Sequence, residues 1–282
     1  MPWRFSTEPG PYAARVWDVL AADPVAHTVA LTVLDGVLSG RRWSDAQMLF
    51  GWYADDGPVT GAVSMTPPFE LLLVEVPTSA LPELVDPLRA QAIPVPGVAG
   101  EASVVDRFVQ LWTAGGRAAG EPTAVPVMRQ RLHRLDRLRA PAAPPAGAPG
   151  RAAVDDIPLV AEWLAAFQRE AGSTEVDVRP AARASVGEGL AWLWRDPTDI
   201  PAALAARTRV VAGMARIAPV YTPPARRRRG YGAAVTTACA RDALHAGAAE
   251  VVLFTDLANP TSNSIYQQIG YEPLRDYRVV RF

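Results

Sequence analysis

The stretch VYTPPARRRRGYGAAV, residues 220–235, places four arginines directly before a Gly-Tyr-Gly. The pattern before it predicts a strand, and the pattern after it predicts a helix. The first turn of a helix has backbone N–H groups without partners and about half a positive charge, which together attract phosphate. Gly230 and Gly232 would let an anion approach the backbone. We therefore predict a loop that binds a strongly anionic group; the alternative is a solvated charge run over Arg226–Arg229.

The composition limits the class of protein. The chain has 282 residues, of which 49% are hydrophobic and 20% are charged. This length and composition predict about two globular domains. All 28 basic residues are arginine, yet the formal net charge is only −1. A broad nucleic-acid surface would need many unpaired basic residues, so we expect a local anion site and no nucleic-acid partner.

Cysteine and histidine are too few for a disulfide or a zinc site. The single cysteine is Cys239, and the three histidines are scattered. We therefore predict no metal and a reducing, cytoplasmic location. No window approaches the roughly 18 apolar residues of a membrane span, so we expect no membrane partner.

The segment APAAPPAGAPG, Ala140–Gly150, has no periodic or charged pattern and is typical of a linker. It predicts a first domain over 1–139 and a second over 151–282. In the second, the patterns predict helices near 154–172 and 181–194, a pair of strands, the arginine loop, then helix, strand, helix and strand. The first half has a similar order of elements, which indicates a duplicated fold whose copies have diverged.

Two motifs resemble those of the GNAT superfamily of N-acetyltransferases. Residues 227–232, RRRGYG, are similar to its coenzyme loop Gln/Arg-x-x-Gly-x-Gly/Ala, and residues 259–271, NPTSNSIYQQIGY, to a second signature that follows the next strand. The resemblance implies an α/β fold with mixed sheets (α+β): two tandem GNAT-like domains, each a mixed, mostly antiparallel sheet flanked by helices. It also implies acetyl-CoA as the acyl donor and an amine as the acceptor. Because the first half lacks the glycine loop, we expect it to be a degenerate copy.

The resemblance assigns the coenzyme contacts to one set of residues in the second half. These are Val220, Tyr221, Thr222, Arg227, Arg228, Arg229, Gly230, Tyr231, Gly232, Asn259, Ser262 and Tyr266.

Tyr266 is the candidate catalytic acid. It follows Asn259 by two helical turns, so both can line one side of a short helix. Transfer from a thioester releases a thiolate that needs a proton, and a tyrosine hydroxyl with a pKa of about 10 can supply it. The resemblance gives Tyr266 this role; the alternative is a buried aromatic residue.

The sequence does not identify the general base. The strand RVVAGMARIAPVYT, 209–222, contains no carboxylate, although the family often places a glutamate there. The candidates are a water chain or one of the carboxylates Glu170, Glu175, Asp177 and Asp256. We expect Cys239 to fill the core and His245 to cap a helix.

Three other functions remain as alternatives. One is an acyltransferase like the synthase of mycothiol formation, the second a non-catalytic acyl-CoA sensor, and the third, disfavoured by the net charge, a nucleic-acid partner. The two carboxylates in the segment 171–178 suit a cationic amine, but they do not identify the acceptor. The oligomeric state stays open, with a homodimer as one option.

Overall fold

A computed structural model describes residues 2–114 and 123–282. The chain forms two compact units, Met1–Gln130 with Arg275–Phe282, and Arg131–Leu274. In the described parts of the chain, no helix has the length and apolar character needed to cross a membrane.

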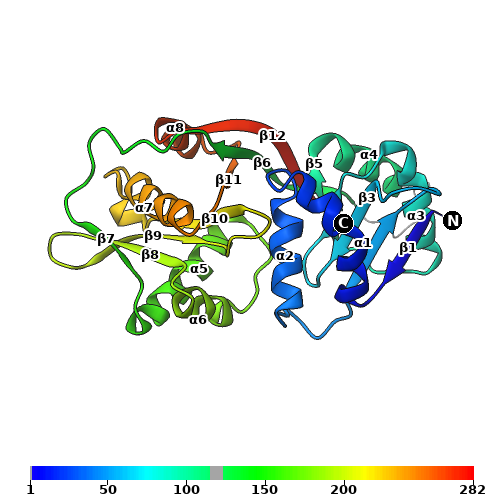
Figure 1. Cartoon of the computed structure of the whole chain (residues 1–282), viewed down its shortest axis with the longest axis horizontal. Helices are drawn as coiled ribbons and strands as arrows, with labels where there is room; N and C mark the ends of the chain where they lie inside the picture. Colours follow the sequence, from blue (N-terminus) through cyan, green and yellow to red (C-terminus); the bar gives the residue numbers. More distant parts are fainter. Residues whose placement is uncertain (1, 115–122) are drawn as a thin grey trace. The chain divides into compact units, whose positions relative to one another are not determined.

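The first unit is a mixed sheet with helices (Figure 1). Strands β1 to β4 pair antiparallel in sequence order, β4 pairs parallel with β5, and β5 pairs antiparallel with the end of β12. The elements that lie wholly or partly in this unit are β1 Trp3–Ser6, α1 Pro9–Ala22, α2 Thr28–Leu38, β2 Leu49–Tyr53, β3 Gly61–Met65, β4 Leu71–Val74, η1 Thr78–Ala80, α3 Leu81–Ala90, β5 Gly97–Glu101, α4 Ala102–Thr113, β6 Val125–Leu135 and β12 Tyr271–Arg281.

The second unit repeats this plan. Strands β7, β8, β9 and β10 pair antiparallel in sequence order, and β10 pairs parallel with β11. The further elements are β7 Ala148–Arg151, η2 Val154–Asp156, α5 Ile157–Ala171, α6 Arg179–Gly187, β8 Ala191–Arg195, β9 Pro201–Arg207, β10 Met214–Tyr221, η3 Pro224–Arg226, α7 Tyr231–His245, β11 Glu250–Asp256 and α8 Pro260–Gln268. The expected fold class, a mixed and mostly antiparallel sheet flanked by helices in each of two tandem domains, is confirmed.

The sheet of the second unit has a core on each face. Ala215 and Ile217 of β10 pack in a cluster with α7, whereas Tyr221 packs in a second cluster with residues of α5 and α6. Figure 1 shows α7 on one side of this sheet and α5 and α6 on the other. Because these three positions are separated by even numbers of residues, alternation alone would keep them on one face; the register shift between Ile217 and Val220 turns Tyr221 to the other face.

The predicted helix over 181–194 is wrong in its second half. Helix α6 ends at Gly187, and residues 191–195 form β8, which pairs with both β7 and β9. Gly189 has a φ of +67°, a conformation that ends helices and favours glycine. Trp192 and Trp194 alternate with Leu193 in a strand that pairs with the distant β7 on one side and with the next strand, β9, on the other.

The two units divide the chain at different places from the predicted boundaries. Residues 275–282 lie in the first unit, because β12 pairs with β5 from Tyr277 opposite Glu101 to Arg281 opposite Gly97. Strand β12 therefore begins in the second unit and ends in the first. Strand β6 crosses the division in the other direction, since its residues up to 130 belong to the first unit.

The segment expected to be a linker, Ala140–Gly150, lies within the second unit, and its last residues start β7. The backbone oxygen of Ala146 accepts a hydrogen bond from the Trp194 indole at 3.2 Å. At Gly147, a Cβ would clash with the backbone oxygen of Arg195, so only glycine fits. Backbone contacts thus anchor a segment that has almost no side-chain pattern.

Candidate active site

The parallel strands β10 and β11 part in the middle of the second unit. They pair only over residues 214–216 and 250–252, although β10 continues to Tyr221 and β11 to Asp256. The pairing of β10 with β9 also shifts register between Ile217 and Val220. Within the described residues, no strand pairing therefore occupies the β10 edge that faces β11 beyond Arg216. This edge can hydrogen-bond an extended ligand.

The loop that follows η3 has the backbone geometry of an anion-binding loop. Arg228 and Gly230 have positive φ values of 61° and 82°, and α7 begins at Tyr231 without a side-chain cap. Among the residues that the structure describes, no acceptor is found for the backbone N–H groups of residues 228–233. A row of free N–H groups at the start of a helix suits a phosphate or pyrophosphate.

The two glycines of this loop serve different purposes. Gly230 adopts a left-handed conformation that residues with side chains rarely take. Gly232 is helical, and a Cβ there would meet only the Thr222 hydroxyl, at 3.5 Å. The protein itself therefore leaves the space beside Gly232 unfilled.

The first two arginines of the run brace the loop. Arg226 donates to Asp196 at 2.9 Å, and the pKa of Asp196 is lowered by hydrogen bonds from the Thr198 hydroxyl, from backbone N–H groups and from Arg226. Arg227 donates to the backbone oxygen of Thr222 at 2.8 Å and pairs with Glu170. The predicted side-chain role of Arg227 in coenzyme binding would thus compete with these contacts.

The last two arginines are available to a ligand. Arg228 and Arg229 are exposed, and neither has a hydrogen bond or an ion pair in the described part of the chain. Two positive charges therefore stand beside the free N–H groups, which favours a dianion over a single charge.

The predicted strand residues line the approach to this loop. Val220 and Thr222 are partly buried, while Tyr221 is buried with its hydroxyl 3.2 Å from Glu170. Tyr231 is buried in the core cluster beside α7.

Asn259 and Ser262 are joined at the start of α8, because the Asn259 side chain accepts from the Ser262 backbone N–H at 3.1 Å. Asn259 is thus a helix cap. Asn263, which the sequence reasoning missed, accepts from the Thr255 hydroxyl at 2.6 Å and donates to the backbone of Asp256 and Asn259. These hydrogen bonds hold α8 to the end of β11. In the sequence, only the position of Asn263 within the NPTSN run could have pointed to this role.

Tyr266 lies in the core beside α7, where its residue is 9% exposed and its ring meets that of Tyr271 edge-on at 6.1 Å. Burial raises the pKa of Tyr266 to about 12, and the Thr236 hydroxyl opposes part of this shift. The phenol therefore carries its proton at neutral pH, as an acid must, while its packing also fits the alternative of a buried aromatic residue.

The candidate bases differ in their surroundings. Glu170 meets Tyr221 and Arg227 at the end of β10. Hydrogen bonds from the side chain and backbone of Arg179 lower the pKa of Asp177 to about 2, which makes it a poor base. Asp256 accepts from the Ala258 N–H at 2.8 Å, and Glu175 is exposed.

Cys239 is buried in the core, and burial raises the pKa of its thiol, as expected for a packing residue. His245 is the last residue of α7 and is exposed. Among the residues that the structure describes, no cluster of three His, Cys, Asp or Glu side chains could hold a metal ion.

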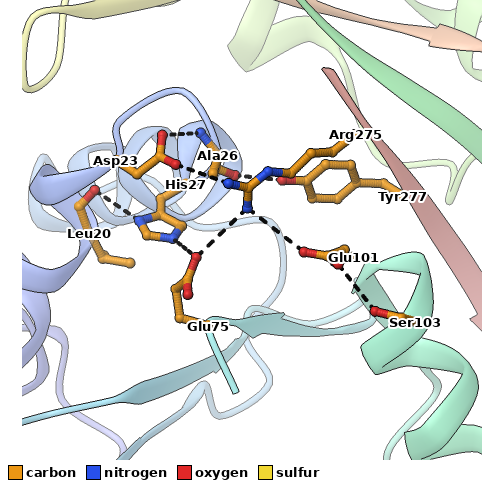
Figure 2. Close-up of polar contacts among 9 residues, drawn as sticks. All are labelled: Leu20, Asp23, Ala26, His27, Glu75, Glu101, Ser103, Arg275 and Tyr277. Atoms are coloured by element: carbon orange, nitrogen blue, oxygen red, sulfur yellow. Dashed lines mark hydrogen bonds and ion pairs between the residues drawn. The ribbon is translucent and has the colours of Figure 1, made fainter. Parts of the chain in front are cut away.

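The corresponding place in the first unit is filled by charged side chains (Figure 2). The guanidinium of Arg275 lies 3.4 Å from Asp23, 3.9 Å from Glu75 and 3.8 Å from Glu101. Glu75 directly follows β4 and Glu101 ends β5, so these carboxylates stand where the parallel strands of this unit end.

His27 and Tyr277 complete this cluster. His27 contacts the Leu20 backbone oxygen and the Glu75 carboxylate, both at 3.0 Å, and Tyr277 donates to the Ala26 backbone oxygen at 2.9 Å. Figure 2 shows that His27 reaches the cluster through the Glu75 carboxylate, which also pairs with Arg275.

Comparison with known proteins finds a family match in the C-terminal part of the chain. Residues 200–280 match the family model described as FR47-like protein. No curated protein matches the chain significantly.

Three solved structures illustrate the likeness in fold. A GCN5-related N-acetyltransferase from Sphaerobacter thermophilus is 14% identical, with a TM-score of 0.63, over 100% of this chain and 95% of that one. A GCN5-related N-acetyltransferase from Kribbella flavida is 20% identical, with a TM-score of 0.56, over 91% and 95%. A tandem GNAT protein from the clavulanic acid biosynthesis pathway is 12% identical, with a TM-score of 0.57, over 99% and 97%. The expected likeness in fold is thus confirmed: the chain has a tandem GNAT-like fold, and its C-terminal part carries the FR47-like match.

Proposed function

We propose that this chain is an N-acetyltransferase that binds acetyl-CoA in its second unit and transfers the acetyl group directly to an amine. One observation carries the proposal: the free N–H groups of residues 228–233, at the start of α7 and beside the parted strands β10 and β11. The GNAT fold supports acetyl transfer in general. The donor and the residue roles are inferred from the site.

The loop would hold the pyrophosphate of the coenzyme. The N–H groups supply hydrogen bonds, and Arg228 and Arg229 supply charge. The pantetheine arm would lie along Val220 to Thr222, on the β10 edge that β11 leaves free. This places the thioester between the two strands, where backbone N–H groups can stabilise charge that develops on its carbonyl oxygen.

The transfer forms one bond and breaks another. The amine nitrogen attacks the thioester carbonyl carbon, and the carbon–sulfur bond breaks with its electron pair on sulfur. The thiolate takes a proton from the Tyr266 hydroxyl, which solvent then restores. The attacking nitrogen loses its extra proton to a base; we assign this to Glu170 through water, because its carboxylate lies at the end of β10.

Only the second unit would bind the coenzyme. The place after β4 in the first unit has Glu75, Glu101 and Asp23 around a single Arg275. Three carboxylates against one guanidinium leave no net positive charge for a pyrophosphate. We expect one coenzyme per chain, with the first copy degenerate.

Titration calorimetry with acetyl-CoA tests the loop. Gly232→Val should abolish detectable binding, because the new side chain would enter the space left beside the N–H groups. The control is Gly10→Val, which makes the same change at the second residue of α1, where a Cβ would meet nothing. Wild-type affinity in Gly232→Val, or two coenzymes per wild-type chain, would refute the assignment.

A non-catalytic acyl-CoA sensor is the second candidate, since Tyr266 is buried in the core and β10 carries no carboxylate. The two functions differ in thiol release. An enzyme releases free coenzyme thiol at a rate that depends on the amine supplied, whereas a sensor binds acetyl-CoA and releases none with any amine.

A further inference from the structure

Arg216 stands where the parallel strands part. It is the last residue of β10 that pairs with β11, opposite Val252, and its backbone N–H donates to the Thr208 hydroxyl at 2.9 Å. Ala215 and Ile217 face α7, so the alternation of a strand directs the Arg216 side chain to the face covered by α5 and α6. Tyr221, further along β10, packs on that same face.

The guanidinium of Arg216 lacks a partner. Its Nη1 is buried without a hydrogen bond, and no ion pair joins its side chain to any residue that the structure describes. Burial lowers the pKa of Arg216 to about 10, so the group stays charged at neutral pH. The residue as a whole keeps part of its surface accessible.

Another buried arginine of this unit, Arg207, has a carboxylate partner within the chain. Arg207, on β9, is 7% exposed in its side chain and donates to Asp242 at 2.7 Å. A buried positive charge is costly unless a negative group meets it. Arg207 has that group within the chain, and Arg216 does not.

We propose that Arg216 binds the carboxylate of a substrate. The planar guanidinium matches a carboxylate in two parallel hydrogen bonds, and a partly buried site strengthens them. This inference rests on the proposed acetyl transfer, because it places the carboxylate beside the thioester, on the α5 and α6 side of β10. It identifies Arg216 as a specificity residue and gives it no part in proton transfer.

Two substrates could carry this carboxylate. One is the acceptor, which would then be an amino acid or a similar amine with a carboxylate. The other is the donor, if the acyl group ends in a second carboxylate, as a succinyl group does. The chemistry at Arg216 is the same in both cases.

Matched probes distinguish the two sources. In the acceptor arm, glycine is compared with glycinamide and L-phenylalanine with L-phenylalaninamide, each in the presence of acetyl-CoA. In the donor arm, succinyl-CoA is compared with acetyl-CoA. Binding is followed by thermal unfolding of the full chain, and transfer by thiol release.

In the wild type, we expect the carboxylate member of at least one acceptor pair, or succinyl-CoA, to bind roughly tenfold to a hundredfold more tightly than its match. Arg216→Met should remove this preference, and Arg216→Lys should keep part of it. Arg241→Met removes an exposed arginine of α7 and serves as the control for lost charge.

Stability without ligand gives a readout that needs no turnover. Because Arg216→Met removes a buried charge with no partner, its unfolding midpoint should rise by about 2–4 °C. A fall in the midpoint would indicate a structural role and overturn the proposal. So would a wild type that distinguishes no pair in either arm.

Different results would refute acetyl transfer and the role of Arg216. If carboxylate-dependent binding depends on Arg216 but no thiol is released, acetyl transfer fails and the role of Arg216 stands. If thiol is released equally from acids and amides and Arg216→Met changes nothing, the transfer stands and the role of Arg216 fails.

Discussion

The two units end their parallel strands with opposite charges. In the second unit, β10 leads through η3 to Arg228, Arg229 and a row of free N–H groups. In the first, β4 leads directly to Glu75, which shares Arg275 with Glu101 and Asp23 (Figure 2). The order of elements is the same, so the backbone plan does not determine which ligand is bound. The side chains at one position along that plan do.

The space between the parallel strands also differs. In the first unit a Cβ on Gly100 would lie 2.9 Å from the Leu73 backbone oxygen, so β5 and β4 stay in close contact beyond their paired residues. In the second unit β10 and β11 have no pairing after Arg216 and Val252. Leu73 and Gly100 thus keep the first strand pair in contact past its last paired residues, whereas the paired part of β10 and β11 ends at Arg216 and Val252.

The largest effect is expected for Tyr266, the candidate acid of the second unit. Tyr266→Phe should lower kcat by roughly a hundredfold to ten-thousandfold, the usual loss when a general acid is removed, with little change in acetyl-CoA affinity. Steady-state kinetics and calorimetry measure the two quantities. Unaltered turnover would return Tyr266 to the role of a packing residue.

The second effect tests the charge contrast. Replacing Arg228 and Arg229 together by glutamate gives this loop the negative character found after β4, and acetyl-CoA affinity should fall by roughly tenfold to several hundredfold. Wild-type affinity should also weaken as salt rises, because exposed charges are screened. The same affinity in the double variant would leave the backbone N–H groups as the sole anchor.

A smaller effect is expected in the first unit. Arg275→Met leaves the half-exposed carboxylates of Glu75, Glu101 and Asp23 close together without their shared cation, so the unfolding midpoint should fall by about 1–2 °C. Arg4→Met, at an exposed position on β1, is the control. Coenzyme affinity should not change; if it drops, the first unit contributes to binding after all.

The smallest effect concerns pH. Because burial holds the pKa of Tyr266 at about 12, the phenol keeps its proton throughout the range in which most enzymes are assayed. We expect no loss of kcat between pH 8 and about 10 from this group. A descending limb centred near pH 9 that disappears in Tyr266→Phe would contradict the burial seen here.

Local patterns predicted much of the second unit. Helix α7, strand β11 and helix α8 follow from periodic apolar residues and from glycines that end helices, all of which act within a few residues. The same logic failed for 191–195, because the identity of β8 depends on β7 and β9 on either side of it. It also missed β7, whose Ala-Pro-Gly-Arg sequence has no strand pattern.

In the candidate site, too, local features could be predicted from the sequence and features that depend on distant neighbours could not. The glycine loop was predictable, since its helix start and its need for positive φ are local properties. Glu170 was predicted only as one of four candidate carboxylate bases, and Arg216 and Arg275 were not recognised, because the importance of all three lies in their neighbours. Glu170 meets Tyr221 from another element, Arg275 meets three carboxylates from distant segments, and Arg216 is notable for having no partner.

The crossing of β12 from the second unit into the first has a consequence for synthesis. The ribosome completes Glu101 long before it makes Tyr277, the residue that pairs with it. At about 5–20 residues per second, the edge of β5 waits on the order of 10 s for its partner strand. During that time the nascent first unit has an uncovered strand edge open to wrong partners, and a stop codon near the end of the gene would damage the half of the protein that was translated first.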